Sequence, residues 1–550
     1  MTVWWERAAV YQIYVRSFAD SGTDGIGDLT GIVDHLDHVS ELGVDAVWLT
    51  PFFPSPQRDH GYDVSDYFGV DPSYGSLTDI DRLIEACHAR GLRVLADIVP
   101  NHCSSDHAWF QAALAAPPSS VERARFYFRD GVGADGSSPP NNWLAMFGGS
   151  AWTRVPDGQW YLHSFTPWQP DFDWANEDVA AMFDAVLRFW FDRGIDGFRV
   201  DAVTHLGKAP ELPDAPSTDG GPMSNPYSLY WPSAHDVWRR WRTVVDQYEL
   251  DHPGRNLVTV AEAYTAGRID VLLDYVRPDE FKQAFSFDLL LSPWNAQTIR
   301  SAIDDTYSAF TSAGAAMTWT LNNHDTQRTV TRYGRTDAAD PASWTGSNLV
   351  YSDAAVDLAI GTTRARAAIV MLAALPGAMY LYQGEELGLP EVLDLDHSVR
   401  TDPIYARTEG REIGRDGCRV PLPWRSEPAA GHGFSAGPAV PWLPQPLDWG
   451  RFSLEHQRGD DDSVFELYRR VLAQRRELSD DSSLRWEFPG IDGIVAFSRA
   501  GILVVLNPTG ERRVLPDVDA ANARVVMSSR PGHTDPSVVP PDTCVWLRRS

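Results

Sequence analysis

The chain has 550 residues and a formal net charge of −28, with 75 acidic residues against 47 lysines and arginines. This negative field argues against binding to nucleic acid or to anionic membranes. Four cysteines without a CxxC pair are no disulfide framework, and no apolar run approaches the 18 residues of a membrane span. The N-terminus lacks the pattern of a signal peptide, so we expect a cytoplasmic protein.

Short apolar runs alternate with helical patterns along most of the chain. The runs cover 9–15, 44–50, 92–99, 195–203, 256–263, 284–291, 317–323 and 378–384. They show little polar alternation, which is typical of parallel strands covered on both faces. Helical patterns over 29–43, 77–91 and 179–194 each end at or beside a glycine, and Thr78 is the candidate N-cap of the second. Eight strand–helix repeats predict a closed (β/α)₈ barrel, an α/β fold.

Two connections are too long for a plain barrel. The segment 102–173, after the third strand, is rich in Pro, Gly and Trp and predicts a small inserted domain. The segment 385–454 follows the eighth strand, and a helix over 463–478 would close the barrel. We therefore assign 1–101 and 174–480 to the barrel. Short alternating runs over 481–550 predict an antiparallel β-domain.

Polar residues gather where the predicted strands end, and in a barrel these ends meet at one mouth. They are Asp97, Asn101, His102, Arg199, Asp201, Glu262, His324, Asp325 and Arg328. A single carboxylate at a strand end is easily a structural ion pair, and we assign Asp97 that supporting role. Carboxylates on three further strands at the same depth are better explained as a functional site.

Paired carboxylates at a barrel mouth suit two chemistries. One is glycoside hydrolysis with a nucleophile and an acid/base, and the other is a divalent-metal site. Spacing alone does not exclude the metal, because His102 and His324 are available. Arg199 beside Asp201 weighs against a metal, since a second cation would oppose it. Arg199 instead suits a role of keeping Asp201 ionised.

The ordered motifs resemble those of the α-amylase-type retaining glycoside hydrolases. DIVPNH (97–102), GFRVDAV (197–203), VAEA (260–263) and NNHD (322–325) match the four main motifs, and 43–51 and 384–390 match two flanking ones. HGYDVSDY (60–67), QPDFDW (169–174) and GRDGCRVPLPW (414–424) are more similar to the α-glucosidase and oligo-1,6-glucosidase branch than to endo-acting amylases. The resemblance spans essentially the whole chain. It implies a barrel, an inserted domain after strand 3 and a C-terminal β-sandwich.

Roles for individual residues follow from this resemblance. It implies that Asp201 is the nucleophile, that Glu262 is the general acid and then the base, and that Asp325 stabilises the distorted sugar ring. The implied substrate-binding residues fall into four groups. His102 and His324 would form hydrogen bonds with sugar hydroxyls. Asp59 and Tyr62 would hold the terminal glucose, with Arg419 as the partner of Asp59. Phe165 and Gln169 would form part of the pocket wall, and Arg328 would line the pocket entrance. For Tyr62 and Phe165, ordinary core packing is the alternative.

The chain departs from the family branch at two places. QPDFD (169–173) stands where the branch usually has QPDLN, which weakens a linkage assignment based on that motif. The acidic loop 20–28 resembles a calcium loop, with Asp20, Asp24, Asp28 and the carbonyl of Ile26 as ligands. Gly22 replaces a usual Asn ligand, so a solvated acidic turn is an equal alternative to a structural calcium site. The chemistry itself requires no cofactor.

The leading hypothesis is an exo-acting α-glucosidase that acts with retention on short oligosaccharides, and that can also transglucosylate. The small Ala202 beside the nucleophile favours α-1,4 over α-1,6 bonds, hence maltose over isomaltose. An isomerase or transglucosidase, such as trehalose synthase or a sucrose isomerase, and an oligo-1,6-glucosidase are the alternatives. A non-catalytic binding relative is disfavoured, because the three catalytic positions are filled. The sequence leaves the oligomeric state open.

Overall fold

The computed structural model describes residues 3–343, 354–479, 481–516, 518 and 522–549. Its centre is a parallel sheet of eight strands, counted within these residues, in the order β10-β11-β1-β2-β3-β7-β8-β9. The strands are β1 (Ala9–Ile13), β2 (Ala46–Leu49), β3 (Arg93–Ile98), β7 (Gly197–Val200), β8 (Val258–Ala261), β9 (Gln283–Ala284), β10 (Thr318–Thr320) and β11 (Ala378–Tyr382). Each lies within or overlaps one predicted run, although the run 284–291 retains only the short β9.

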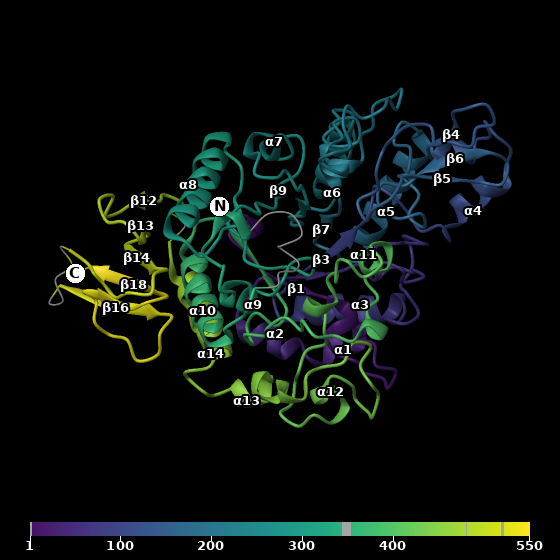
Figure 1. The fold of residues 1–550 in the computed structure, drawn as a ribbon. Coiled ribbons are helices and arrows are strands. Elements are labelled where there is room, and N and C mark those ends of the chain that lie inside the picture. Colours follow the sequence, from purple (N-terminus) through teal and green to yellow (C-terminus); the bar gives the residue numbers. More distant parts are fainter. Residues whose placement is uncertain (1–2, 344–353, 480, 517, 519–521, 550) are drawn as a thin grey trace.

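Side-chain bonds bring the two ends of this strand order together. Thr318 Oγ1 donates to the carbonyl of Ala284 at 2.6 Å and accepts from the amide of Ser286 at 3.2 Å. The sheet therefore nearly closes into a cylinder, and the predicted (β/α)₈ barrel is confirmed. Helices cover its outer face (Figure 1). Both faces of each strand are thus covered, which is why β1 is buried at every position.

The helices follow the predicted pattern with small shifts. The α-helices are α1 (Leu29–Asp34), α2 (Leu36–Leu42), α3 (Leu77–Ala89), α4 (Ala108–Ala115), α5 (Glu177–Asp192), α6 (Ala234–Asp251), α7 (Ile269–Asp274), α8 (Ala296–Ala313), α9 (Thr329–Gly334), α10 (Leu358–Ala374), α11 (Pro403–Arg407), α12 (Ala429–Gly433), α13 (Leu454–Gln457) and α14 (Val464–Glu477). In α5 the buried Val179, Phe183, Val186 and Trp190 recur at helical spacing and face the barrel core. Across the part of the chain that is described, no helix is both long and apolar enough to cross a membrane.

Two details of the predicted helices are wrong. The predicted helix 29–43 is divided into α1 and α2 at His35, whose backbone leaves the helical region. The N-cap of α3 is Ser76 rather than Thr78, which is already inside the helix. The carboxylate of Asp79 accepts from both the amide and the hydroxyl of Ser76, at 2.9 and 2.6 Å. The Ser76 side chain in turn accepts from the backbone amide of Asp79, and this capping box satisfies the first turn and fixes where α3 begins.

The segment after β3 forms a compact unit with its own sheet. Besides α4 it contains a three-stranded antiparallel sheet of β4 (Phe128–Asp130), β6 (Gln159–Leu162) and β5 (Trp152–Arg154), in that order. The long loop after β7 packs against it, since Asn141 Nδ2 donates to the carbonyl of Leu212 at 2.9 Å. The loop after β11 also reaches it, since Arg407 Nε donates to the carbonyl of Phe147 at 3.1 Å. Three long loops therefore meet above one end of the barrel.

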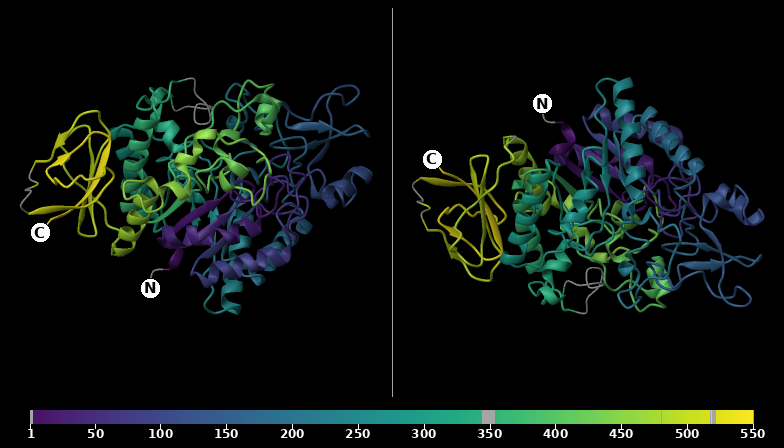
Figure 2. Two further views of the ribbon diagram at one scale, coloured as in Figure 1. Left: turned by 90° about the horizontal axis from the view of Figure 1, so that it is seen from below. Right: turned by 90° about the horizontal axis from the view of Figure 1, so that it is seen from above.

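The C-terminal residues form an antiparallel domain at the opposite side of the barrel from the β4–β6 sheet (Figures 1 and 2). Its main sheet has the order β12-β13-β14-β18-β16, beside a two-stranded β15-β17 sheet. The bounds are β12 (Arg485–Trp486), β13 (Val495–Arg499), β14 (Ile502–Asn507), β15 (Arg513–Val514), β16 (Ala523–Ser528), β17 (Val538–Val539) and β18 (Thr543–Arg549). Residue 480, where the predicted domain boundary falls, lies outside the described residues.

The main sheet of this domain buries apolar side chains on both of its faces. In β14, Val504 and Leu506 join the barrel core, whereas Leu503 and Val505 join a separate core with Val539 of β17. The alternation follows the two-residue period of a strand. Trp546 Nε1 donates to the carbonyl of Val370 in α10 at 2.8 Å. The domain is thus fastened to the barrel through one face and covered by the small sheet on the other.

Candidate active site

A cavity of about 470 Å³ opens at the end of the barrel where the strands terminate. Of the predicted site residues, it is lined by Asp59, Tyr62, His102, Phe165, Asp201, Glu262, His324 and Asp325. They come from the connections after β2, β3, β7, β8 and β10. Parallel strands carry all of these connections at one face, so residues far apart in sequence converge.

Arg199 of β7 lies at the base of this cavity and pairs with three carboxylates. Its Nη1 lies 2.6 Å from Asp201 Oδ1 and 2.9 Å from Asp97 Oδ1, and its Nη2 lies 2.9 Å from Glu262 Oε1. The guanidinium is 2% exposed, so these pairs are little screened by water. One cation cannot neutralise three buried anions, and the cluster therefore favours holding a proton.

The pKa values of the carboxyl groups reflect their burial first and then this shortage of positive charge. Burial raises the pKa of Asp97 to about 7, with Arg199 opposing the rise. Burial also raises the pKa of Asp201 and that of Glu262, again against Arg199. Asp97 further accepts from Tyr62 Oη at 3.0 Å and from Trp48 Nε1 at 3.2 Å, which is the supporting role expected from the sequence.

Backbone contacts fix the two carboxylates relative to each other. The amide of Asp201 donates to the carbonyl of Ile98, and the amide of Glu262 donates to that of Val200, both at 2.9 Å. Ala202 has a left-handed backbone with φ of 49°, and its amide donates to Glu262 Oε2 at 2.9 Å. The turn that follows Asp201 therefore also orients Glu262.

Asp325 is held ionised by surrounding cations. Arg415 Nη1 and Arg419 Nη2 lie 2.8 and 2.9 Å from its Oδ1, and His324 Nε2 lies 3.2 Å from its Oδ2. Although burial raises its pKa, the nearby His324 imidazole and the two guanidinium cations of Arg415 and Arg419 together hold the pKa well below its usual range; the two arginines carry the permanent positive charge. Such a carboxylate is suited to accept hydrogen bonds from sugar hydroxyls.

The partner of Asp59 is Arg415, and the prediction of Arg419 is wrong. Arg415 Nη2 lies 3.2 Å from Asp59 Oδ1, and Arg415 Nε lies 2.6 Å from the fully buried Asp402. Arg419 instead donates through Nε to the carbonyl of His324 at 2.9 Å. Both arginines belong to the GRDGCRV motif. Only Arg415 contacts both Asp59 and Asp402, and these two carboxylates hold its guanidinium in place.

Gln169 and Arg328 do not line the cavity as predicted. Gln169 is completely buried behind Asp59, where its Nε2 donates to Asp59 Oδ2 at 2.9 Å, so it acts on the cavity only through that carboxylate. Arg328 is 1% exposed and donates to the carbonyls of Gln383 and Cys418 at 3.0 and 2.8 Å. It ties two loops together beneath the site, because buried carbonyls require donors.

The aromatic and imidazole side chains both pack and line the cavity. The rings of Tyr62 and His324 stack at 5.3 Å, and Tyr62 Oη lies 2.7 Å from His324 Nε2. Phe165 lies 4.9 Å from the ring of His102. Burial lowers the pKa of His102 to about 4 and that of His324 further still. Both imidazoles are therefore neutral near pH 7 and act as hydrogen-bonding groups.

Sequence reasoning missed much of the outer wall. The additional lining residues include Met146, Phe147, Thr204, His205, Met223, Tyr264, Ile404, Arg411, Glu412, Ile413 and Arg415. Most come from the three long connections after β3, β7 and β11. Single apolar residues in such loops follow no periodic pattern, so only Arg415, within a recognised motif, could have been found from the sequence.

The acidic loop 20–28 closes on itself. Asp20 accepts from the amides of Gly22 and Gly25 at 2.7 and 2.9 Å, and Asp24 accepts from that of Ile26 at 2.9 Å. Asp28 is the N-cap of α1. Among the residues that the structure describes, no group of three or more His, Cys, Asp or Glu side chains is arranged to hold a metal. The loop does not fit a calcium cage in this arrangement, and calcium binding there stays a prediction from the sequence.

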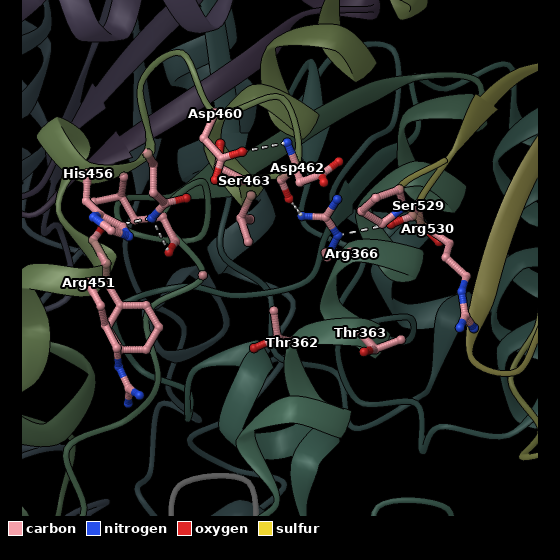
Figure 3. A pocket seen from close by; sticks show the side chains of 16 residues that line it. Thr362, Thr363, Arg366, Arg451, His456, Asp460, Asp462, Ser463, Ser529 and Arg530 are labelled. Atoms are coloured by element: carbon pink, nitrogen blue, oxygen red, sulfur yellow. Dashed lines mark hydrogen bonds between the residues drawn. The ribbon is translucent and has the colours of Figure 1, made fainter. Parts of the chain in front are cut away.

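A second cavity, of about 560 Å³, lies at the junction of the barrel and the C-terminal domain (Figure 3). Arg366 of α10 occupies its wall and donates to the carbonyls of Ser529 and Asp462, at 3.0 and 2.9 Å. None of the predicted site residues lines it. It is a seam between domains, away from the carboxylates.

The comparisons with known proteins agree with this geometry. Residues 12–481 match the family model of the alpha amylase catalytic domain. A probable alpha-glucosidase of Rhizobium meliloti is 37% identical over 86% of this chain and 82% of its own length. An oligo-1,6-glucosidase of Saccharomyces cerevisiae is 32% identical over 89% of this chain and 86% of its own. The crystal structure of an alpha-glucosyl transfer enzyme, XgtA, covers both chains completely at 33% identity, with a TM-score of 0.84. The chain belongs to the α-amylase family and is a glycoside hydrolase of that family.

Proposed function

We propose that this enzyme is an exo-acting α-glucosidase that cleaves terminal α-glucosidic bonds with retention, through a glucosyl ester on Asp201. The observation that carries the proposal is the cluster around Arg199, which pairs with both Asp201 and Glu262 at the base of the cavity. A shared cation keeps two carboxyl groups close. That suits the short separation of retaining enzymes, about 5–5.5 Å, rather than the longer one that must admit a water.

The two carboxyl groups divide the chemistry. Burial raises the pKa of both groups, and Arg199 lies closer to Asp201, at 2.6 Å, than to Glu262, at 2.9 Å. In this proposal Glu262 therefore carries the proton and gives it to the leaving oxygen. Asp201, ionised beside Arg199, attacks C1 from the opposite face. In the second half, Glu262 takes a proton from water while the water oxygen attacks C1 and releases Asp201. Asp325, which its cationic neighbours hold ionised, binds the ring hydroxyls as the ring flattens.

The charged contacts around Asp59 support exo action. Asp59 is 4% exposed and is held by Arg415 from the β11 connection and by Gln169 from the inserted segment. The ring centre of Phe147 lies 5.2 Å from the guanidinium carbon of Arg415. This end offers charged partners to a terminal glucose.

The finer specificity rests on smaller features. Ala202 leaves room beside the nucleophile, which favours the closer leaving ring of an α-1,4 bond and hence maltose over isomaltose. Transfer in place of hydrolysis, as the name of the alpha-glucosyl transfer enzyme describes for that protein, is the second candidate. Trehalose synthase, sucrose isomerase and oligo-1,6-glucosidase activities differ from the proposed α-1,4-glucosidase activity only in the acceptor or in the linkage.

The test is a product-resolved assay by NMR with maltose, isomaltose, sucrose and trehalose. We expect α-glucose to appear first from maltose and to mutarotate later, and Asp201→Asn to lower turnover by about 10⁴-fold while the fold persists. Early β-glucose, or a folded and active Asp201→Asn variant, would contradict the mechanism. Since no step needs a Lewis acid, EDTA should leave the turnover of the folded enzyme unchanged.

A further inference from the structure

The second cavity, at the seam between the barrel and the C-terminal domain, contains a buried cation without an ionic partner (Figure 3). Arg366 of α10 is 8% exposed. Its Nε and Nη1 donate to the carbonyls of Ser529 and Asp462, and among the residues that the structure describes its Nη2 has no hydrogen-bond partner. A buried charge is costly unless it is paired, so this guanidinium would be stabilised by an anion in the cavity.

The charges around Arg366 do not neutralise it by contact. Burial, and next the nearby Arg470, lower the pKa of Arg366 to about 10, with Asp462 and Asp460 opposing this fall. Both aspartates line the cavity, but in the described part of the chain neither carboxylate forms an ion pair, and Asp460 Oδ1 accepts from the amide of Asp462 at 3.1 Å. Arg530, which directly follows Ser529 and also lines the cavity, likewise forms no ion pair within the described residues. Two guanidinium groups therefore face this cavity without a carboxylate on either.

The rest of the lining suits a molecule that carries hydroxyl groups. Ser463 Oγ and Ser529 Oγ each accept from a backbone amide, at 3.1 and 3.0 Å, so each keeps its hydroxyl hydrogen for a ligand. The exposed carboxylates of Asp460 and Asp462 can accept from ligand hydroxyls. Phe452 adds apolar surface, and the volume of about 560 Å³ lies in the usual range for small-molecule sites. Cations and hydroxyl acceptors in one cavity match a ligand with both an anionic group and several hydroxyls.

We propose that this seam cavity binds a phosphorylated monosaccharide, with its phosphate on Arg366 and Arg530 and its hydroxyls on the two aspartates. Guanidinium groups bind phosphate through charge-assisted and often bidentate hydrogen bonds. Such a ligand contacts α10 and the turn after β16 at once, so it stabilises the docking of the C-terminal domain on the barrel. The inference goes beyond the proposed function and does not depend on it, because the two cavities share no lining residue.

The probe is glucose 6-phosphate, followed by isothermal titration calorimetry and by thermal melts. A ligand that binds only the folded protein should raise the melting temperature by about 2 °C at 100 times its Kd for a chain of this length. Inorganic phosphate, which lacks the sugar hydroxyls, should bind about 10-fold more weakly. Chloride at the same ionic strength should leave the melting temperature unchanged.

Two variants of α10 assign the binding to this cavity. Arg366→Met should weaken the binding of glucose 6-phosphate about 10–100-fold, since it removes a hydrogen-bonded charge. Thr363→Glu places a carboxylate three residues from Arg366 on the same helix face, where it should occupy the guanidinium and weaken binding similarly. The matched control is Thr243→Glu on α6, because both threonines are exposed and donate to the carbonyl four residues earlier, each at 2.9 Å.

A further titration separates this cavity from the active site. Arg415→Leu, which removes a cation from the glucose-binding end of the active cavity, should bind glucose 6-phosphate as the wild type does. Loss of binding in that variant, wild-type binding in a folded Arg366→Met or Thr363→Glu protein, or no binding at all would overturn the proposal. Equal affinity for inorganic phosphate would overturn the assignment of a sugar. Circular dichroism establishes which variants are folded, and the conservative Thr363→Glu keeps the test decisive if Arg366→Met is not.

Discussion

Replacing Arg415 by leucine should disable the glucose-binding end of the cavity. Arg415 is 14% exposed and pairs with Asp325, Asp402 and Asp59 at 2.8, 2.6 and 3.2 Å, so its loss leaves three carboxylates without this cation. Removing one partner of a buried pair costs about 3–5 kcal/mol. That cost falls on folding stability; for catalysis we expect a fall in kcat/KM of roughly 10²–10³-fold, since Asp325 keeps Arg419 while Asp59 loses its cation.

The pH dependence of kcat/KM provides an independent test of the role of Arg415. Burial already raises the pKa of Asp59, and Arg415 is the main group that lowers it. Without Arg415 the pKa values of Asp59 and Asp325 both rise, so their ionised forms are lost at a higher pH as the solution is acidified. The acidic limb of kcat/KM against pH should therefore move to higher pH in Arg415→Leu.

The assay is kcat/KM for p-nitrophenyl α-glucoside between pH 4 and 9, with thermal melts to confirm folding. Arg415→Lys should fall between the wild type and Arg415→Leu, because an ammonium cannot reproduce the planar fork that reaches several carboxylates. The matched control is Arg451→Leu, which removes an exposed arginine whose ion pair is with Asp448. A folded Arg415→Leu enzyme within threefold of the wild type, or one with an unshifted acidic limb, would refute this account.

Three further substitutions test other parts of the site. Glu262→Gln should lower activity on maltose far more than on p-nitrophenyl α-glucoside and should remove the alkaline limb of the pH profile, because a good leaving group needs little protonation; equal losses would argue against Glu262 as the acid. Ala202→Val should shift the preference in kcat/KM from maltose toward isomaltose. It should also lower the melting temperature, since a branched residue is strained at a φ of 49°. Ala202→Gly should relieve the strain and keep the maltose preference. Arg328→Met should lower the melting temperature through its two lost carbonyl bonds but leave KM nearly unchanged, and a large rise in KM would restore Arg328 to the entrance.

The sequence by itself determined the barrel and the strand ends at which the three carboxylates meet. Parallel strands covered on both faces must be continuous apolar runs, so all eight could be located before the structure was known. Carboxylates that interrupt such runs are costly, and their place at the strand ends predicted that Asp201, Glu262 and Asp325 would converge. Because strand direction alone sets which end of a strand reaches the mouth, this convergence required no knowledge of the loops.

Only the tertiary structure decided which side chains from the loops reach the cavity. Arg415 and Arg419 are four residues apart in one motif, and their chemistry is identical. Asp402 holds Arg415 toward Asp59, whereas Arg419 turns to the carbonyl of His324. Arg328 turns inward for the same reason, because buried carbonyls of two other segments require donors. Such choices depend on hydrogen-bond partners that lie up to hundreds of residues away, and they leave no mark on local sequence.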